Sequence, residues 1–224
     1  MKKNNLFKTI LLSTVVILSS CSKNSDDDVT PVGCTVENTP MSYVFTNDGN
    51  NTVYFGGQSN RLATAKAVYD MLNAGKGSAT AVTSADITAV IDNDNSKLLT
   101  KTAEATHNPN HVHIIEQLNS ILDGYAAISS TLADTNIVAS AGQAGWKGSY
   151  QLDARGWELD QLYAKMLIGA LCLEQNAYDY LTKINIIDEN DNRGYDGNDT
   201  YYTKAEHYWD EAFGYTYGMD GDIT

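Results

Sequence analysis

Cysteines, prolines and long apolar runs are scarce in this chain of 224 residues. It contains three cysteines and three prolines, and it has no Cys-x-x-Cys pair that would offer a zinc or redox site. Cys34 lies in a polar segment and Cys172 in an apolar one, so we expect no structural disulfide between them. The apolar run of residues 10–18 is too short to span a bilayer as a stable helix. The chain is, however, long enough to bury a hydrophobic core.

Positive charge is scarce as well. The sequence has 15 lysines and arginines against 28 aspartates and glutamates, a formal net charge of −13. A field of this sign repels nucleic acid and anionic lipid and attracts cations. We therefore expect no nucleic-acid partner. Net charge alone does not separate a cation-binding surface from one that is merely soluble.

The first 20 residues are typical of a lipoprotein signal peptide. Three lysines flank the start of the apolar run, and Leu18-Ser-Ser-Cys21 forms a lipobox. This pattern predicts cleavage before Cys21 and lipidation of that cysteine, so the chain is expected to reach the membrane through an N-terminal lipid. Residues 21–41 are polar and acidic and predict a flexible tether. A helical domain over residues 42–224 is expected to follow.

Residues 42–224 show the apolar spacing of a helical bundle. Two aromatic segments, 42–45 and 52–55, flank an Asn-Asp-Gly-Asn-Asn turn and predict a β-hairpin. Beyond it, apolar residues recur at intervals of three and four and predict helices over residues 59–75, 84–91, 112–132, 153–183 and 202–215. The predicted fold class is all-α, a helical bundle with a small N-terminal β-hairpin.

The segment 202–215 carries the densest group of ligand-type side chains. Thr203 and Glu206 form a capping box, which marks the start of a helix. His207, Asp210 and Glu211 follow at intervals of three and four, so they share one helix face. Imidazole and carboxylate donors suit iron, manganese or zinc. These three residues are therefore candidate metal ligands.

Glu158, in the first half of the apolar segment 153–183, is the candidate fourth ligand. A buried carboxylate needs a partner, because an isolated charge in an apolar place is costly. His207 or a metal ion would be its functional partner, and Lys165 its structural one. In the structural alternative, the whole cluster is an ordinary hydrogen-bond network or a solvated helix face.

Three further segments bear on function. His107, His111 and His113 lie in or beside a polar segment that we predict to be mobile, and we interpret them chiefly as surface residues. The Gly- and Ala-rich residues 139–148 lack the ending of a phosphate loop and predict a flexible loop. Residues 188–199 are rich in oxygen ligands, but their spacing departs from that of a calcium-binding EF-hand loop and favours a plain connector.

Several blocks of the chain resemble a known family. They are Tyr54-Phe-Gly-Gly-Gln58 with Arg61-Leu62, Ala141-Gly-Gln-Ala-Gly145, residues 158–170, Asp191-Asn192, and Glu206-His-Tyr-Trp-Asp-Glu-Ala-Phe-Gly-Tyr215. In this order they are similar to an uncharacterised family of Bacteroidetes lipoproteins, domain of unknown function 4856, which itself resembles the imelysin-like proteins. The resemblance implies an all-helical, exported protein associated with iron uptake. The Gly-x-His-x-x-Glu motif of imelysin-like proteins is matched here with alanine at residue 205 and aspartate at residue 210.

The resemblance also bears on location and extent. The acidic run Ser22-Lys-Asn-Ser-Asp-Asp-Asp28 resembles the signal that sends Bacteroidetes lipoproteins to the outer face of the outer membrane, a plain linker being the alternative. We therefore expect an outer-membrane lipoprotein exposed at the cell surface. Members of the resembled family run longer, so we expect this chain to be the N-terminal part of a longer protein.

The leading hypothesis is a cell-surface or outer-membrane lipoprotein that binds a metal ion or metal complex in iron uptake. Its cofactor would be a divalent metal or iron, held by His207, Asp210, Glu211 and Glu158. We do not expect an enzyme, because no Ser-His-Asp set or dinucleotide fingerprint is found. A metal-dependent hydrolase with Glu211 as base is the minor alternative.

A second hypothesis has no metal. The same cluster would be structural, and the lipoprotein would bind its partner through an aromatic surface formed by Trp146, Tyr195, Tyr201 and Tyr202. The sequence leaves both hypotheses open.

Overall fold

The computed structural model describes residues 42–92, 97–184, 193–194 and 200–219. The chain divides into two compact units, Met1–Thr39 and Pro40–Thr224, and the described residues all belong to the second. The predicted signal peptide, Cys21 and the tether lie outside the described residues, as does most of the acidic segment 188–199.

The predicted β-hairpin is present but shorter than expected. Strand β1 (Thr46–Asn47) pairs antiparallel with β2 (Asn50–Asn51). The two residues between them have φ angles of 50° and 80°, and positive φ at both positions is what a type I′ hairpin turn requires. The flanking aromatic residues pack elsewhere instead of extending the strands. Tyr43 stacks on Phe213 with ring centroids 3.6 Å apart.

Most helices lie close to their predicted positions. They are α1 (Gly56–Gly75), α2 (Ser84–Asp92), the short α3 (Leu98–Lys101), α4 (His111–Ser129), a long rod described next, and α7 (Lys204–Tyr217). Helix α3 was not predicted, because its segment is mostly polar and too short to show a period. The polar segment after α2 is therefore partly ordered.

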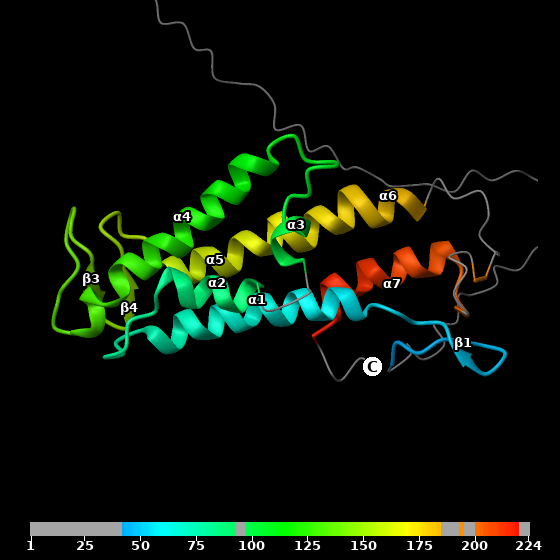
Figure 1. Cartoon of the computed structure of the whole chain (residues 1–224), viewed down its shortest axis with the longest axis horizontal. Coiled ribbons are helices and arrows are strands. Elements are labelled where there is room, and N and C mark those ends of the chain that lie inside the picture. Colours follow the sequence, from blue (N-terminus) through cyan, green and yellow to red (C-terminus); the bar gives the residue numbers. More distant parts are fainter. Residues whose placement is uncertain (1–41, 93–96, 185–192, 195–199, 220–224) are drawn as a thin grey trace, which may run out of the picture. The chain divides into compact units, whose positions relative to one another are not determined.

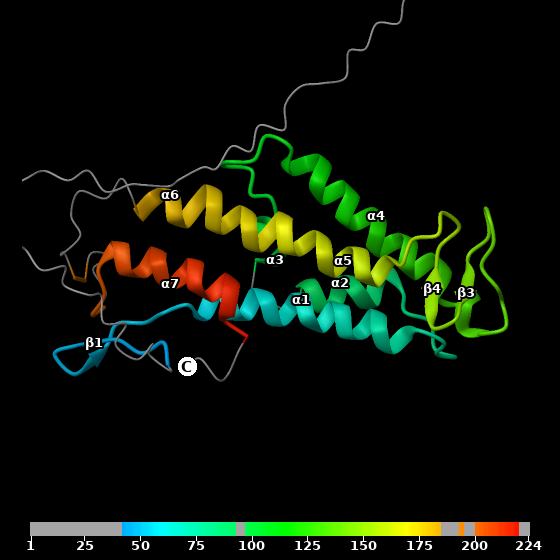
Figure 2. The same cartoon turned by 180° about the vertical axis from the view of Figure 1, so that it is seen from behind.

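The longest helix is α-helical only at its two ends. It starts as α5 (Leu159–Leu167), continues through two π-helical segments, η2 (Ile168–Leu173) and η3 (Gln175–Tyr180), and finishes as α6 (Leu181–Ile184). Figures 1 and 2 show these segments as one rod that runs beside α4 and α7. The rod starts six residues later than predicted, because a strand and a tight turn occupy the residues before it.

A second hairpin occupies the end of the segment predicted to be a flexible loop. Strand β3 (Gly145–Lys147) pairs with β4 (Tyr150–Leu152), and Gly148 supplies the positive φ of the turn. Gly145 lets the backbone of β3 pack closely against that of Ala139, because a Cβ at residue 145 would lie 2.4 Å from the Ala139 backbone nitrogen. The prediction of a flexible loop is therefore wrong here, since the glycines permit tight backbone packing.

The core forms where α1, α4 and α5 meet, and α7 closes against α1. Its most deeply buried side chains are Val68, Leu72, Leu118, Tyr125, Leu159, Tyr163 and Leu171. At the start of α7, Thr203 Oγ1 accepts a hydrogen bond from the Glu206 N–H, and the Glu206 carboxylate accepts one from the Thr203 N–H. The predicted capping box and the all-α fold class are therefore confirmed. In the part of the chain that the structure describes, no helix combines the length and apolarity needed to cross a membrane.

Candidate metal centre

Two of the four predicted metal ligands meet on α7. His207 Nε2 lies 3.7 Å from Glu211 Oε2, one turn further along the helix. The His207 ring stacks on Tyr202 with centroids 4.8 Å apart. Glu211 also accepts a hydrogen bond from Gln58 Nε2 at 2.9 Å. The pair is thus embedded among aromatic and amide groups where α7 meets the start of α1.

Asp210, on the same helix, is directed toward the residues around the first hairpin. It is 4% exposed and accepts hydrogen bonds from the Tyr43 hydroxyl at 2.5 Å and the Tyr54 N–H at 2.9 Å. Burial raises the pKa of Asp210, and these two hydrogen bonds only partly oppose that effect. Both carboxylate oxygens therefore tie the hairpin region to α7.

Glu158 does not join the others. Its Oε1 lies 2.9 Å from Lys76 Nζ, and the same ammonium lies 2.6 Å from Oδ2 of the buried Asp160. Lys76 directly follows the C-terminal end of α1, whereas Gln58, the partner of Glu211, lies in its first turn. At a rise of about 1.5 Å per residue these ends are about 27 Å apart. The expected convergence of Glu158 with the α7 residues therefore does not occur.

The aromatic side chains of the second hypothesis do not form one described surface. Tyr202 stacks on His207, and Trp146 donates from Nε1 to the Leu132 carbonyl at 3.1 Å. Tyr201 is partly exposed, and Tyr195 lies outside the described residues.

A different group of ligand-type side chains converges beside the loop between α3 and α4. Among the described residues, Glu104, His107 and Asp179 each offer one ligand atom, and these atoms all lie within 4.8 Å of one another. Glu174 adjoins them, with Oε1 2.6 Å from His107 Nδ1. We call these four residues the His107 cluster.

The polar atoms at the centre of this cluster are poorly satisfied. His107 Nε2 lies 3.5 Å from Glu104 Oε2 and Nδ1 lies 2.6 Å from Glu174 Oε1, but in neither contact are the atoms aligned for a hydrogen bond. The other Glu174 oxygen, Oε2, accepts a hydrogen bond from Gln175 Nε2 at 3.2 Å. Glu174 is only 5% exposed, so water offers it little compensation. Buried polar atoms in this state are costly and uncommon. A cation held between them would satisfy them.

The π-helical winding explains why two of the carboxylates face the same way. Residues five apart lie on different faces of an α-helix, whereas the i→i+5 bonding of a π-helix brings them nearly above one another. Glu174 and Asp179 are five apart, flank or lie in η3, and are both buried. π-Helical turns are rare and frequently found at functional sites.

The loop between α3 and α4 is fastened to the same rod. Ala103 has a positive φ of 48°, which is uncommon for a residue with a Cβ, and its N–H donates to the Ala170 carbonyl at 2.6 Å. Gln175 Nε2 donates to the Lys101 carbonyl at 2.9 Å. Strained backbone of this kind persists only where its surroundings impose it, and it clusters at functional sites. The loop is thus held in place, contrary to the mobility predicted from its composition.

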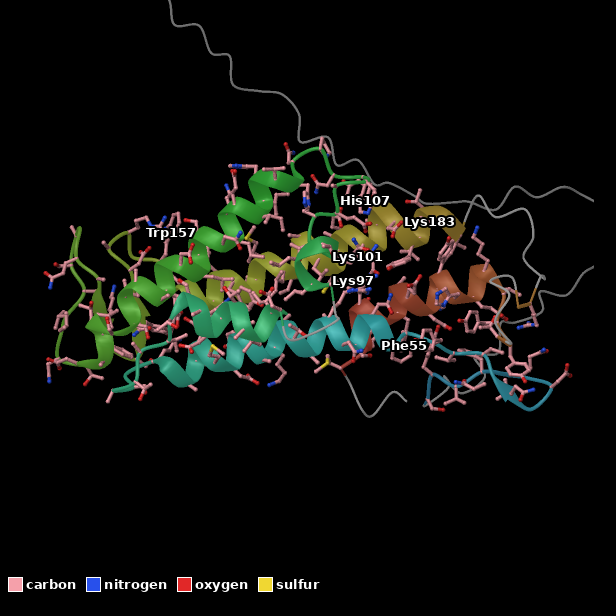
Figure 3. The ribbon with its side chains drawn as sticks, in the orientation of Figure 1. Phe55, Lys97, Lys101, His107, Trp157 and Lys183 are labelled. Carbon is pink, nitrogen blue, oxygen red and sulfur yellow. The ribbon has the colours of Figure 1, made fainter. Side chains whose placement is uncertain are left out.

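Two lysines neutralise part of the cluster. Lys101 Nζ lies 2.6 Å from Glu104 Oε2, and Lys183 forms an ion pair with Asp179. Figure 3 shows Lys101, His107 and Lys183 gathered around this part of the rod. Three carboxylates and two ammonium groups leave the cluster one positive charge short when His107 is neutral.

The carboxylates of the cluster differ in their proton affinity. Burial would raise the pKa of Glu104, but hydrogen bonds from Lys101 and Gln175 outweigh it and bring the pKa below its ordinary value. For Glu174, burial dominates and raises the pKa despite the neighbouring His107. The same arrangement of charges therefore contains one carboxyl that favours ionisation and one that resists it.

Of the four residues of this cluster, the sequence pattern pointed only to His107. The interpretation of His107 as a surface residue is wrong, because its side chain is 16% exposed and contacts Glu174. Glu104, one helical turn before it in the sequence, is the signal that could have marked the segment. Glu174 and Asp179 lie more distant in sequence, and their common direction depends on a π-helical winding that apolar spacing does not reveal.

One protein family matches most of the chain, over residues 40–224, under the description Domain of unknown function (DUF4856). The chain belongs to this family. The DUF4856 region therefore includes the hairpins, the helical bundle and the His107 cluster, and the resemblance of the sequence blocks to domain of unknown function 4856 is confirmed. No curated protein and no solved structure matches the chain.

Proposed function

We propose that this DUF4856 protein is a lipid-anchored outer-membrane protein, exposed at the cell surface, that binds a divalent metal ion at the His107 cluster. The observation that carries the proposal is the approach of ligand atoms from Glu104, His107 and Asp179 to within 4.8 Å of one another. We also propose that metal capture serves iron uptake, as the resemblance to imelysin-like proteins of Bacteroidetes implies.

The charges of the cluster favour this role. Lys101 and Lys183 pair with two of the carboxylates and together carry the charge of one divalent ion. A divalent ion that displaced both ammonium groups would therefore leave the net charge of the cluster unchanged. The two lysine side chains are 23% and 43% exposed, so each ammonium can move into water when an ion arrives. The net charge of −13 also raises the local concentration of cations.

The donor set narrows the choice of metal. One imidazole nitrogen with carboxylate oxygens suits zinc, manganese or divalent iron, whereas calcium and magnesium favour oxygen ligands alone. Donors about 2.1 Å from a tetrahedral ion are about 3.4 Å apart. The separation of up to 4.8 Å must therefore shrink by up to about 1.4 Å on binding, a shift within reach of side-chain rotation.

Metal titration of the metal-free mature protein tests the site. Zinc, manganese or divalent iron should bind with a stoichiometry of one and raise the melting temperature, because binding at 100 times Kd stabilises by about 2.7 kcal/mol. His107→Ala and Asp179→Asn should each weaken binding by about tenfold or more. His113→Ala is the matched control, since this histidine is exposed on α4 and contacts Gln117. Its affinity should equal that of the wild type.

Two further variants distinguish this site from α7. Lys183→Gln removes a competing cation and should strengthen metal binding, whereas a His207→Ala, Glu211→Gln double variant should leave it unchanged. Loss of metal in the double variant alone would assign the ion to α7. A wild type that neither binds these metals nor gains thermal stability from them would contradict the proposal.

Lipid anchoring has its own test. Cys21→Ser should move the protein from the membrane fraction to the soluble fraction, because the lipid supplies the attachment, while Cys34→Ser should leave it in the membrane. The measurement is fractionation followed by immunoblotting, together with protease treatment of intact cells. Membrane retention of Cys21→Ser, or full protection of the wild type from protease, would argue against a lipid-anchored surface protein.

A further inference from the structure

A cavity of about 560 Å³ lies between α4 and α5, formed by residues outside the His107 cluster. Ile121 from α4 and Leu162 and Met166 from α5 give it an apolar wall. Trp157, just before α5, adds an indole ring that is 48% exposed. Cavities that combine an apolar wall with a few polar groups are typical of small-molecule sites.

The charged side chains that line this cavity are both positive, and one of them, Arg155, also forms an ion pair with Asp153 beside the cavity. Arg155 and Lys165 line it, and none of its lining residues is an aspartate or glutamate, although acids outnumber bases by 28 to 15 in the chain. Lys165 Nζ donates to Gln161 Oε1 at 2.7 Å, so Lys165 is not the partner of Glu158 that the sequence suggested. Within the described residues, Lys165 forms no ion pair with a carboxylate. Its charge is therefore available to an anion.

A buried carboxylate holds the other cation in place. Asp153 is 7% exposed and accepts hydrogen bonds from the N–H groups of Arg155 and Trp157 and from Arg155 Nε, at 2.7 to 2.9 Å. This turn lays the Arg155 guanidinium over the Trp157 ring, with Cζ 3.9 Å from the ring centroid. Both side chains are thus fixed before any ligand arrives, which lowers the entropic cost of binding.

We propose that this cavity binds a small organic anion with a flat apolar body, of the class of aromatic carboxylates. The carboxylate pairs with Lys165 and with the edge of Arg155 that Asp153 leaves open. The ring lies against Trp157 and the wall formed by Ile121, Leu162 and Met166. An arginine already stacked on an aromatic ring is suited to a planar carboxylate, because its fork of N–H donors matches the two oxygens.

Calorimetric titration with two matched probes tests this site. The acid is 2-naphthoate, and the neutral counterpart with the same ring system is 2-naphthylmethanol. The wild-type mature protein should bind 2-naphthoate about tenfold more tightly than the alcohol. Lys165→Gln should remove most of this preference while leaving the melting temperature unchanged. Lys147→Gln, which removes an exposed lysine from β3, should bind both probes like the wild type.

The outcomes separate charge recognition from simple apolar contact. Trp157→Phe should weaken both probes, since it reduces the ring surface while keeping an aromatic ring under the Arg155 guanidinium. Equal affinity of the wild type for acid and alcohol would overturn the proposal, as would unchanged 2-naphthoate binding in Lys165→Gln. Failure to bind 2-naphthoate at all would overturn it too. None of these results depends on whether the His107 cluster holds a metal.

Discussion

Replacing Lys76 by alanine is expected to lower the free energy of unfolding by about 3–5 kcal/mol. The Lys76 ammonium lies between Glu158 and Asp160, and the Asp160 side chain is only 1% exposed. Without Lys76, the buried Asp160 carboxylate has little access to water, and within the described part of the chain no other cation forms an ion pair with it. Breaking a buried ion pair from one side is costly for this reason. Urea denaturation followed by circular dichroism measures the loss.

The controls use the same helix and the same network. Lys66→Ala removes a lysine whose i,i+4 pair with Asp70 is exposed, so it should cost no more than about 0.5 kcal/mol. Adding Asp160→Asn to Lys76→Ala should restore much of the stability, because the stranded charge is gone. If the two lysine variants were equally stable, the buried network would not carry the stability assigned to it.

The ion pairs of Lys76 also predict how the stability of the fold depends on pH. Burial lowers the pKa of Lys76, but hydrogen bonds to Asp160 and Glu158 outweigh that effect and raise the pKa above its ordinary 10.5. A raised lysine pKa means that the native state binds the proton more tightly than the unfolded state does. The stabilisation is therefore complete below pH 10.5 and is lost as the pH rises through the folded-state pKa.

Asp210→Ala is expected to destabilise the fold by about 2–3 kcal/mol, whereas Asp210→Asn should be nearly neutral. Alanine leaves the Tyr43 hydroxyl and the Tyr54 N–H without their acceptor. Asparagine can accept from the Tyr54 N–H through its oxygen and donate to the Tyr43 hydroxyl oxygen through its nitrogen, because a hydroxyl group both donates and accepts. The same denaturation measurement compares the two variants.

This pair of variants distinguishes a structural carboxylate from a metal ligand. Asparagine is a poor replacement for a ligating carboxylate, so a stable Asp210→Asn variant with lost metal binding would reinstate Asp210 as a ligand. Burial raises the pKa of Asp210 above its ordinary 3.8, so the native state binds this proton more tightly than the unfolded state. The contribution of Asp210 to the free energy of unfolding is therefore complete below pH 3.8 and falls as the pH rises through the folded-state pKa. Asp210→Asn should abolish this pH dependence.

Local signals in the sequence were sufficient wherever neighbouring residues decide the outcome. The Thr203–Glu206 capping box spans one turn, and the Asp-Gly turn between β1 and β2 depends on two adjacent residues. Helices α1 and α4 follow from apolar side chains that recur within the same helix. In each case the relevant contacts lie within a few residues, so the pattern and the structure agree.

The same local rules did not show which of the predicted ligands would come together. Helical spacing put His207, Asp210 and Glu211 on one face, but a face does not say what it packs against. Asp210 accepts a hydrogen bond from the first hairpin region, and Glu211 accepts one from the start of α1. Glu158 forms an ion pair with Lys76, just after the end of α1. The partners of these groups are 82 to 167 residues away in the chain, and no spacing rule reaches that far.

The sequence by itself determined that this is an all-α chain with a small hairpin, where most of its helices lie, and how α7 begins, because hydrogen bonding and side-chain spacing within one element set these features. Only the tertiary structure decided which charged groups meet. The His107 cluster needs a loop held by Ala103 and a π-helical segment that turns Glu174 and Asp179 the same way. Both depend on packing between segments about 70 residues apart, since a change in winding is stabilised by the neighbours that accept its displaced backbone groups.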